Sequence, residues 1–367
     1  MPKRKYTIIS LVGARPQFVK LAPLAKRLSR SFQHIIIHSG QHYDNRMSDV
    51  FFKQLKIPSP DKNLNIGSGS HGAQTGKMLE LFERELVKVR PDMVLVYGDT
   101  NTTMAGALAA VKLHIPIGHI EAGLRSFNDT MPEEINRKVT DHVSSLLYYP
   151  TPAARKNLKA EGLSRGLIRS GDLMYEILDA CTNLPYFKKN HQRKFGVSSG
   201  DYCLVTLHRA ENADNKERLS SFVSILQSLP YQTIFLAHPR TVKNLKKFGL
   251  YSQLKKSPSV IISQPVPYLE TLSLLNGAKA LLTDSGGMQK EAYFLGIPCL
   301  TLRPETEWVE TVASGDNTLT DMSRTKVLRV LKQISWRKRK KLNYKINGRM
   351  PSDVISKSIS KFLQKKS

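Results

Sequence analysis

The sequence has few cysteines and no long apolar run, and these two absences exclude several classes of protein. The three cysteines, Cys181, Cys203 and Cys299, are scattered and form no Cys-x-x-Cys pair or Cys/His cluster. This spacing argues against a disulfide framework and a zinc site, and it favours the reducing cytosol. No apolar stretch reaches the length that spans a bilayer. The apolar residues after Met1–Lys5 are too few for a signal peptide, so we expect a first β-strand there.

Acidic residues are scarce beside basic ones, with 30 Asp and Glu against 56 Lys and Arg, so the formal net charge is +26 at pH 7. Such an excess is typical of proteins that bind nucleic acid, a membrane surface or an anionic small substrate. The one dense basic run, Arg337–Lys341, has no interleaved aromatic residues, which a single-strand binding platform requires. We therefore interpret this run as solvated surface, and we expect neither nucleic-acid binding nor membrane insertion.

The order of apolar and amphipathic segments predicts an α/β fold with two Rossmann-like, doubly wound domains that face a cleft. At 367 residues the chain is long enough for two such cores. We expect an N-terminal domain over residues 1–171 and a C-terminal domain over residues 172–350. Residues 351–367 form a final segment, in which 352–363 has amphipathic helical spacing and is expected to pack back on the first domain.

Each predicted domain alternates strands with helices. In the first domain the strands are Tyr6–Val12, His34–His38, Met93–Tyr97, Ile117–Ile120 and Leu146–Tyr149, and the helices include Met47–Leu55, His71–Val89 and Thr102–Leu113. In the second domain the strands are Tyr202–Leu207, Thr233–Ala237, Ser259–Ile262, Ala280–Thr283 and Pro298–Leu302, and the helices are Lys216–Leu229, Tyr268–Asn276 and Met288–Leu295. Ligands bind outside the carboxyl ends of strands in such sheets, so the residues directly after strands are the candidates for a site.

The most informative segment follows the strand at 280–283 and contains Ser285, Gly286 and Gly287. A strand that turns through Ser-Gly-Gly into a helix brings exposed backbone N–H groups and a helix N-terminus to one point, which favours a bound phosphate. Glu291 lies about one turn into that helix, within reach of a ribose diol beside the phosphate. The alternative is an ordinary strand–turn–helix corner in which glycine allows tight packing.

Charged and polar residues also follow the other predicted strands. In the first domain they are Arg15, Lys20, Asp99, Glu121, Arg125, Glu133, Glu134 and Arg137, and in the second they are His208, Arg209, Glu211, Asn212, His238 and Arg240. Burying charge at the ends of apolar strands is costly without a purpose, and crowded carboxylates separate one another's pKa values, which suits acid/base catalysis. Structural alternatives remain open. Asp99 could cap the following helix, and Glu134 could pair with Arg137 within one helix. The two histidines could be buried and hydrogen-bonded.

Seven motifs in order give a resemblance to a known family. They are Gly13–Pro16, Ser39–His42, Tyr97–Thr100, His119–Arg125, Pro132–Arg137, Thr206–Asn212 and Ser285–Gly287. Over nearly its full length the chain resembles the non-hydrolysing UDP-N-acetylglucosamine 2-epimerases. The resemblance implies a fold similar to that of the GT-B glycosyltransferases, with UDP held mainly by the C-terminal half.

The resemblance also implies a reaction. Such enzymes eliminate UDP in the anti sense to leave a bound 2-acetamidoglucal, protonate it on the opposite face and add UDP back, without a metal or cofactor. By matching position, Asp99, Glu121 and Glu133 are the acid/base candidates, and which of them is the base stays open. Arg15, Lys20 and His208 would stabilise phosphate charge. Further substrate contacts would come from Arg209, Glu211, Asn212, His238, Ser285, Gly286, Gly287 and Glu291.

Two regions depart from the pattern of many bacterial members. Residues 43–47 and 64–74 differ where those enzymes bind a second, allosteric UDP-N-acetylglucosamine, so such regulation stays open here. The short loop 125–131 and the segment 303–309 resemble the branch that acts on UDP-2,3-diacetamido-2,3-dideoxy-glucuronate. The carboxylate of that sugar would need an additional cation, which Arg125, Arg240 or Arg303 could supply.

The resemblance therefore leads to an expected function with alternatives. We expect a cytosolic, homodimeric UDP-N-acetylhexosamine 2-epimerase of the UDP-GlcNAc to UDP-ManNAc type, serving cell-surface polysaccharide precursor synthesis. The same reaction on UDP-2,3-diacetamido-2,3-dideoxy-glucuronate is the first alternative. A GT-B glycosyltransferase that uses a UDP-sugar is an alternative of another class, and a non-catalytic polyanion-binding protein is the third.

Overall fold

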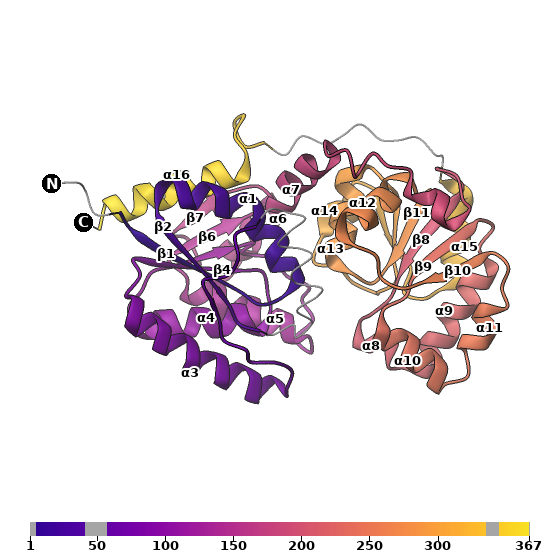
Figure 1. Ribbon diagram of the computed structural model, residues 1–367, viewed down its shortest axis with the longest axis horizontal. Coiled ribbons are helices and arrows are strands. Elements are labelled where there is room, and N and C mark those ends of the chain that lie inside the picture. The colour runs from indigo at the N-terminus through magenta and orange to yellow at the C-terminus, as the bar shows by residue number, and fades with distance from the viewer. Residues whose placement is uncertain (1–4, 41–56, 335–344, 367) are drawn as a thin grey trace. The chain divides into compact units, whose positions relative to one another are not determined.

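The computed structural model describes residues 5–40, 57–334 and 345–366, and the chain divides into two compact units (Figure 1). Unit 1 comprises Met1–Ile177 and Tyr344–Ser367, and unit 2 comprises Leu178–Asn343. The division falls inside helix α7 (Leu173–Thr182), a few residues after the predicted boundary at Gly171. Helix Met47–Leu55, expected from the sequence, lies outside the described residues.

Unit 1 contains a seven-stranded sheet in the order β3-β2-β1-β4-β5-β6-β7, and every described strand pair is parallel. The strands are β1 (Thr7–Val12), β2 (Gln33–His38), β3 (Lys62–Asn63), β4 (Met93–Tyr97), β5 (Ile117–Ile120), β6 (Leu146–Tyr149) and β7 (Leu167–Arg169). Strands β1 and β4 are buried along their whole length, as expected where helices cover both faces of a parallel sheet. The strand order reverses between β1 and β4, where such folds bind ligands.

The helices of unit 1 pack closely on this sheet. They are α1 (Arg15–Ser31), α3 (His71–Val89), α4 (Asn101–Lys112), α5 (Pro132–Val143), α6 (Pro152–Ala160), the first part of α7, and α16 (Pro351–Gln364). A Cβ on Gly106 of α4 would lie 2.5 Å from Leu11 Cδ2 of β1, so only glycine allows this approach. The core lies between β1, β4 and the helices α3 and α4. None of the described helices is both long and apolar enough to cross a membrane.

The final helix, α16, belongs to unit 1. Its buried face includes Ile355 and Ile359, which have no exposed surface. Asp353 pairs with Arg27 of α1 at 2.8 Å, and the backbone N–H of Ser352 donates to Glu176 of α7 at 2.8 Å. These contacts join the end of the chain to the helices at both ends of unit 1's longer segment.

Unit 2 contains a second parallel sheet, in the order β10-β9-β8-β11-β12-β13. Its strands are β8 (Tyr202–Thr206), β9 (Gln232–Leu236), β10 (Val260–Ser263), β11 (Ala280–Thr283), β12 (Cys299–Thr301) and β13 (Asn317–Leu319). Its helices are the 3₁₀ helix at His191–Phe195, α8 (Ala210–Ala213), α9 (Lys216–Ser228), α10 (Pro239–Lys247), α11 (Tyr251–Lys255), α12 (Tyr268–Gly277), α13 (Gly286–Leu295), α14 (Val309–Ala313) and α15 (Arg324–Gln333). The predicted α/β class with two doubly wound parallel sheets is confirmed.

Candidate active site

Glu121 lies directly after β5, in a turn of unusual backbone geometry. Its φ is +75° and that of Gly123 is +82°, and the N–H groups of Glu121 and Ala122 both donate to Tyr148 O at 3.0 Å. The carboxylate accepts a hydrogen bond from Lys20 Nζ of α1. A Cβ on Gly98 would lie 3.2 Å from Lys20 Nζ, so a glycine after β4 makes room for this ion pair. The unusual turn therefore aims Glu121 at the switch point of the sheet.

The Glu121–Lys20 pair is buried, and burial controls the proton affinity of Glu121. Burial raises the pKa of Glu121 to about 7, Lys20 opposes this rise, and the charges of Asp172 and Asp99 add to it. Burial alone lowers the pKa of Lys20, but Glu121, Asp99 and Asp172 together raise it above its ordinary value. Glu121 Oε1 is buried without a hydrogen-bond partner among the described residues. A carboxyl group that titrates near neutral pH and has an unused oxygen is suited to proton transfer.

Asp99 follows β4 and lies beside the same pair, held by α5. Arg137 Nη2 donates to Asp99 Oδ2 at 2.5 Å, and Asn136 Nδ2 donates to the Asp99 backbone carbonyl at 2.9 Å. The N-cap of α4 is Thr100, so the alternative role of Asp99 as that cap is wrong. About a third of the Asp99 side chain is exposed, which leaves it accessible to a ligand.

The adjacent glutamates of α5 have different environments. Glu134 has no exposed surface and accepts hydrogen bonds from the Ser126 and Phe127 N–H groups at 2.9 and 3.1 Å. It also pairs with Arg137 Nη1 at 2.8 Å, so its structural alternative is correct. Glu133, the acid/base candidate, is half-buried in the first turn of α5.

Asp172 is a further carboxylate of this cluster that the sequence analysis missed. It follows β7 after Gly171, and only 4% of its surface is exposed. Its charge raises the pKa values of both Glu121 and Lys20. The rule that selects residues directly after strands would have found it, had the three-residue strand β7 been recognised.

Two arginines of the N-terminal motifs, Arg15 and Arg125, were expected to contact the substrate. The side chain of Arg15, at the start of α1, lies outside the described residues. Arg125 was expected to contact a sugar carboxylate, but it is buried and binds Glu161 through Nε and Nη2 at 2.6 and 2.7 Å. Its Nη1 lies 2.8 Å from Asp141, which also lies 2.7 Å from His119 Nδ1. Because carboxylates of the chain already bind all three of its nitrogens, Arg125 instead joins β5 to α5 and α6.

In unit 2, Asp284 follows β11 and is fully buried. It accepts hydrogen bonds from the backbone N–H groups of His208 and Arg209, at 3.2 and 2.9 Å, and from Asn212 Nδ2 at 3.0 Å. Although burial opposes this, its hydrogen bonds and the His208 side chain lower the pKa of Asp284 to about 2. Asp284 thus remains charged and fastens the segment after β8 to the segment after β11. It too was missing from the predicted site.

Ser285 caps α13, and its Oγ accepts from the Met288 N–H at 3.4 Å. A Cβ on Gly286 would lie 2.3 Å from Glu307 Oε1, so a larger residue at 286 would displace the Glu307 carboxylate. Gly287 follows in the first turn, and Glu291 lies buried in the second turn of the same helix. The N-terminal amides and the dipole of α13 therefore form a loop suited to a phosphate.

The residues after β8 and β9 surround that loop in unit 2. His208 and Arg209 are half-buried, Glu211 and His238 are exposed, and the His208 and His238 rings lie 5.9 Å apart. The alternative that these two histidines are buried is therefore wrong. Asn212 has no exposed surface, because its amide binds Asp284 and its Oδ1 accepts from Arg218 Nε at 2.6 Å. Contrary to the prediction, Asn212 holds the loop together and is not open to substrate.

The two arginines of unit 2 that were expected to bind a sugar carboxylate are paired within the chain. Arg303 is buried, with Glu307, Glu211 and Glu305 oxygens 3.3, 3.7 and 3.9 Å from its guanidinium nitrogens. Arg240 lies on the surface, and its Nε donates to Asp214 at 2.8 Å. Neither of them, nor Arg125, offers a cation without a carboxylate partner.

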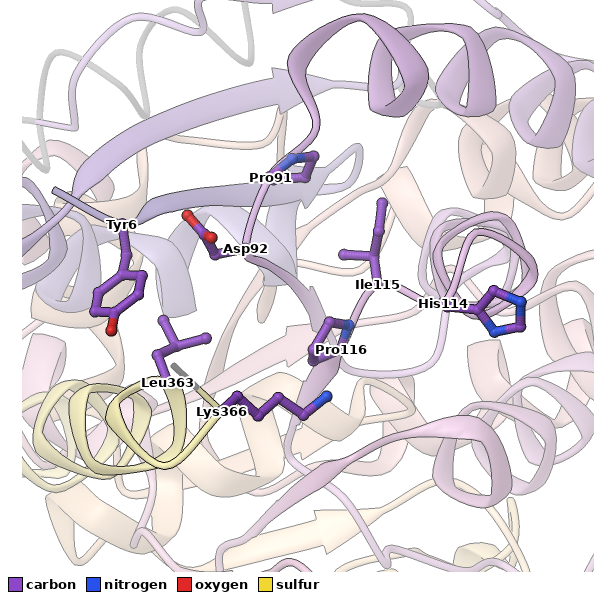
Figure 2. A pocket seen from close by; sticks show the side chains of 8 residues that line it. All are labelled: Tyr6, Pro91, Asp92, His114, Ile115, Pro116, Leu363 and Lys366. Carbon is purple, nitrogen blue, oxygen red and sulfur yellow. The ribbon is translucent and has the colours of Figure 1, made fainter. Parts of the chain in front are cut away.

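A separate hollow of about 250 Å³ lies at the opposite edge of the unit 1 sheet (Figure 2). Tyr6 precedes β1, Asp92 precedes β4 and Pro116 precedes β5, while Lys366 follows α16. Tyr6, Asp92 and Pro116 thus stand at the amino ends of strands, whereas Glu121 and Asp99 follow carboxyl ends. The hollow is therefore separate from the carboxylate cluster. Within the described ranges, no group of three or more His, Cys, Asp or Glu residues is arranged to hold a metal ion.

Comparison with known proteins identifies the family of the chain. The family model described as UDP-N-acetylglucosamine 2-epimerase matches residues 26–349. The chain belongs to this family. A UDP-N-acetylglucosamine 2-epimerase homolog of Methanococcus maripaludis is 53% identical over 323 residues, which cover 88% of this chain and 90% of the relative.

Two further members extend the comparison. The UDP-2,3-diacetamido-2,3-dideoxy-D-glucuronate 2-epimerase of Pseudomonas aeruginosa is 45% identical over 330 residues, covering 88% of this chain and 90% of that epimerase. The crystal structure of the Methanocaldococcus jannaschii UDP-GlcNAc 2-epimerase in complex with UDP-GlcNAc and UDP is similar with a TM-score of 0.89. That epimerase is 43% identical, and the match covers 97% of this chain and 99% of the other.

Proposed function

We propose that this chain epimerises a UDP-N-acetylhexosamine at C2, in the manner of the UDP-GlcNAc to UDP-ManNAc conversion. The hydrogen at C2 is not α to a carbonyl, so direct removal would be slow. Anti elimination of UDP leaves a 2-acetamidoglucal, which is protonated at C2 on the opposite face before UDP adds back to C1. The observation that carries the proposal is Glu121, a buried carboxyl group with a pKa of about 7 and an unused oxygen.

The residues of unit 1 supply the proton transfers. Asp99, Glu121 and Glu133 divide the removal and return of the C2 proton among them, and positioned groups of this kind contribute about 10²–10⁴-fold to a rate. Lys20 holds Glu121 and brings positive charge to the site. Losing one such electrostatic donor costs about 10²–10³-fold where it faces the developing charge.

The residues of unit 2 hold the leaving group. The N–H groups of Gly286 and Gly287 and the hydroxyl of Ser285 bind the diphosphate at the start of α13, and Glu291 binds the ribose diol. His208, Arg209 and His238 add donors near the phosphates, with Glu211 at the rim. The complex of the M. jannaschii relative with UDP-GlcNAc and UDP supports a nucleotide-sugar ligand for this fold.

Proton NMR in D₂O tests the proposal directly. Purified protein with UDP-N-acetylglucosamine should incorporate deuterium at C2 and produce the manno isomer, with no acceptor added. A GT-B glycosyltransferase would instead consume the UDP-sugar only when an acceptor is present. Absence of exchange in protein that binds UDP, measured by calorimetry, would contradict the epimerase and favour the glycosyltransferase.

A second candidate substrate is UDP-2,3-diacetamido-2,3-dideoxy-glucuronate, because the P. aeruginosa relative is named as the 2-epimerase of that sugar nucleotide. Against it, Arg125, Arg240 and Arg303 already have carboxylate partners in this chain. The same NMR experiment with both sugars decides between them, because the substrate with the higher kcat/KM identifies the branch.

The cellular setting forms part of the same proposal. We infer a homodimer in the cytosol that supplies cell-surface polysaccharide synthesis. The three cysteines are buried and free, which fits a reducing compartment. Light scattering on the purified protein measures its mass in solution, and a monomer across micromolar concentrations would contradict the dimer.

A further inference from the structure

We propose that Asp172 is a positioning residue of the epimerase reaction, which keeps the catalytic proton on Glu121 while it fastens the first turn of α7. This inference rests on the proposed function. It adds a residue from the end of β7, a strand that none of the seven sequence motifs includes.

The sheet brings Asp172 to the acid/base group. Asp99 follows β4, Glu121 follows β5 and Asp172 follows β7, so the three carboxylates share the carboxyl edge of one parallel sheet. All lie close enough to Lys20 of α1 for their charges to act on its ammonium group. Three carboxylates around one ammonium group carry excess negative charge, which favours a retained proton on one of them.

Other charged groups nearby are already matched. Arg137 of α5 binds both Asp99 and Glu134, and its charge is therefore shared between two carboxylates. His119 of β5 is directed to Asp141 and to the Gly98 carbonyl. Glu121 thus senses chiefly its own burial, Lys20, Asp172 and Asp99.

The same side chain also starts a helix. Asp172 Oδ1 accepts a hydrogen bond from the Met174 N–H at 2.8 Å, and the Asp172 carbonyl accepts from the Tyr175 N–H at 3.1 Å. Helix α7 then carries the chain from unit 1 into unit 2. In the first turn of α7, Glu176 accepts hydrogen bonds from the backbone N–H and the hydroxyl of Ser352 of α16. Because the start of α7 is held at Asp172 and again at Glu176, the helix fixes the position of the Asp172 carboxylate.

Asp172→Asn separates the two roles. Asparagine keeps an Oδ1 acceptor for the Met174 N–H but removes the negative charge. The pKa of Glu121 should therefore fall, because one of the charges that raises it is gone. The ionisation near pH 7 in the kcat/KM profile should move to lower pH, by on the order of one unit. This direction is the same whether Glu121 acts as base or as acid.

The experiment has two measurements, of which one does not depend on turnover. The pH profile is recorded for wild type, Asp172→Asn and the control Asp179→Asn, which removes the same charge two turns further along α7. In parallel, protein labelled with ¹³C in the glutamate carboxyl carbons is titrated by NMR, with Glu121→Gln to assign the Glu121 signal. We expect both ionisations to shift to lower pH in Asp172→Asn and to stay in place in Asp179→Asn.

Two outcomes would overturn the proposal. One is a Glu121 titration in folded Asp172→Asn that superimposes on that of wild type. The other is an equal shift in Asp179→Asn, which would indicate a general charge effect. A third outcome separates the two proposals. If wild type shows no epimerisation but the pKa of Glu121 is still lower in Asp172→Asn than in wild type, the proposed function fails and the electrostatic coupling of the two carboxylates stands.

Discussion

Glu121 of unit 1 and Asp284 of unit 2 are comparable carboxylates, because each directly follows a buried parallel strand: Glu121 follows β5 and Asp284 follows β11. Both are buried, yet the pKa of Glu121 is raised to about 7 and that of Asp284 is lowered to about 2. The difference lies in their partners. Glu121 has two carboxylates nearby and accepts a hydrogen bond from one lysine. Asp284 accepts hydrogen bonds from two backbone N–H groups and from the side-chain amide of Asn212.

This comparison teaches that burial alone does not decide what a carboxylate does. Backbone N–H donors stabilise the ionised form of a carboxylate and lower its pKa, so Asp284 stays charged near neutral pH and fixes the shape of a loop. A buried carboxyl group among other carboxylates binds a proton near neutral pH and is able to return it. The carboxyl end of a parallel strand thus carries a carboxylate with a fixed charge in unit 2 and one that binds a proton near neutral pH in unit 1.

The largest expected effect comes from removing the carboxyl group that binds this proton. Glu121→Gln should lower kcat by about 10²–10⁴-fold, because Gln neither takes nor gives a proton. Circular dichroism and UDP affinity by calorimetry should stay near wild type, since the proposed UDP site lies in unit 2. Glu83→Gln, an exposed substitution of the same kind on α3, is the control. Turnover within threefold of wild type in Glu121→Gln would remove Glu121 from the reaction.

The next effect comes from removing the fixed charge. Asp284→Asn places amide hydrogens against the N–H groups of His208 and Arg209, so the free energy of unfolding should fall by about 1–3 kcal/mol, and UDP affinity should fall with it. Because the pKa of Asp284 is about 2 in the folded protein and 3.8 without it, its charge contributes about 2 kcal/mol of stability above pH 3.8.

The pH dependence checks the sign of this contribution. The stability is lost progressively as the pH falls from the unfolded-state pKa of 3.8 through the folded-state value of about 2. Urea unfolding from pH 6 downwards should show the difference between wild type and Asp284→Asn shrinking as acid is added. A difference that stays constant between pH 6 and pH 3 would show that Asp284 is not the depressed carboxylate.

The smallest expected effect separates two adjacent glutamates. Glu134→Gln should lower the free energy of unfolding by about 1 kcal/mol, because it weakens the hydrogen bonds to the 126–127 segment and the pair with Arg137. Glu133→Gln should leave the unfolding free energy unchanged and lower turnover instead. Chemical denaturation and the D₂O assay measure both. An equal loss of stability in the two variants would contradict this division of roles.

The sequence predicted the central strands well because their apolar runs are continuous. The bounds of β4, β5, β6 and β11 agree with the prediction to the residue. It missed β3, β7 and β13, which have only two or three residues each and show no periodicity over so short a run. Missing β7 also meant missing Asp172, the residue placed by that strand.

The candidate site was predicted by residue type and position, and it was incomplete where long-range partners decide the role. Arg125 and Asn212 looked like ligand contacts in sequence, but their partners Glu161 and Asp284 lie 36 and 72 residues away. No local pattern indicates such a partner. Glu121 and the Ser285–Gly287 loop were found because each directly follows a strand that the sequence analysis recognised.

The return of α16 to unit 1 has a consequence for how the chain is made. The ribosome delivers unit 1's first 177 residues, then all of unit 2, and only afterwards the helix Pro351–Gln364. Domains generally fold as units during synthesis, so unit 2 is able to fold completely while unit 1 still waits for Ile355 and Ile359 to cover its open face. A transcript cut short after residue 343 would therefore yield a complete unit 2 joined to a unit 1 that lacks its last helix.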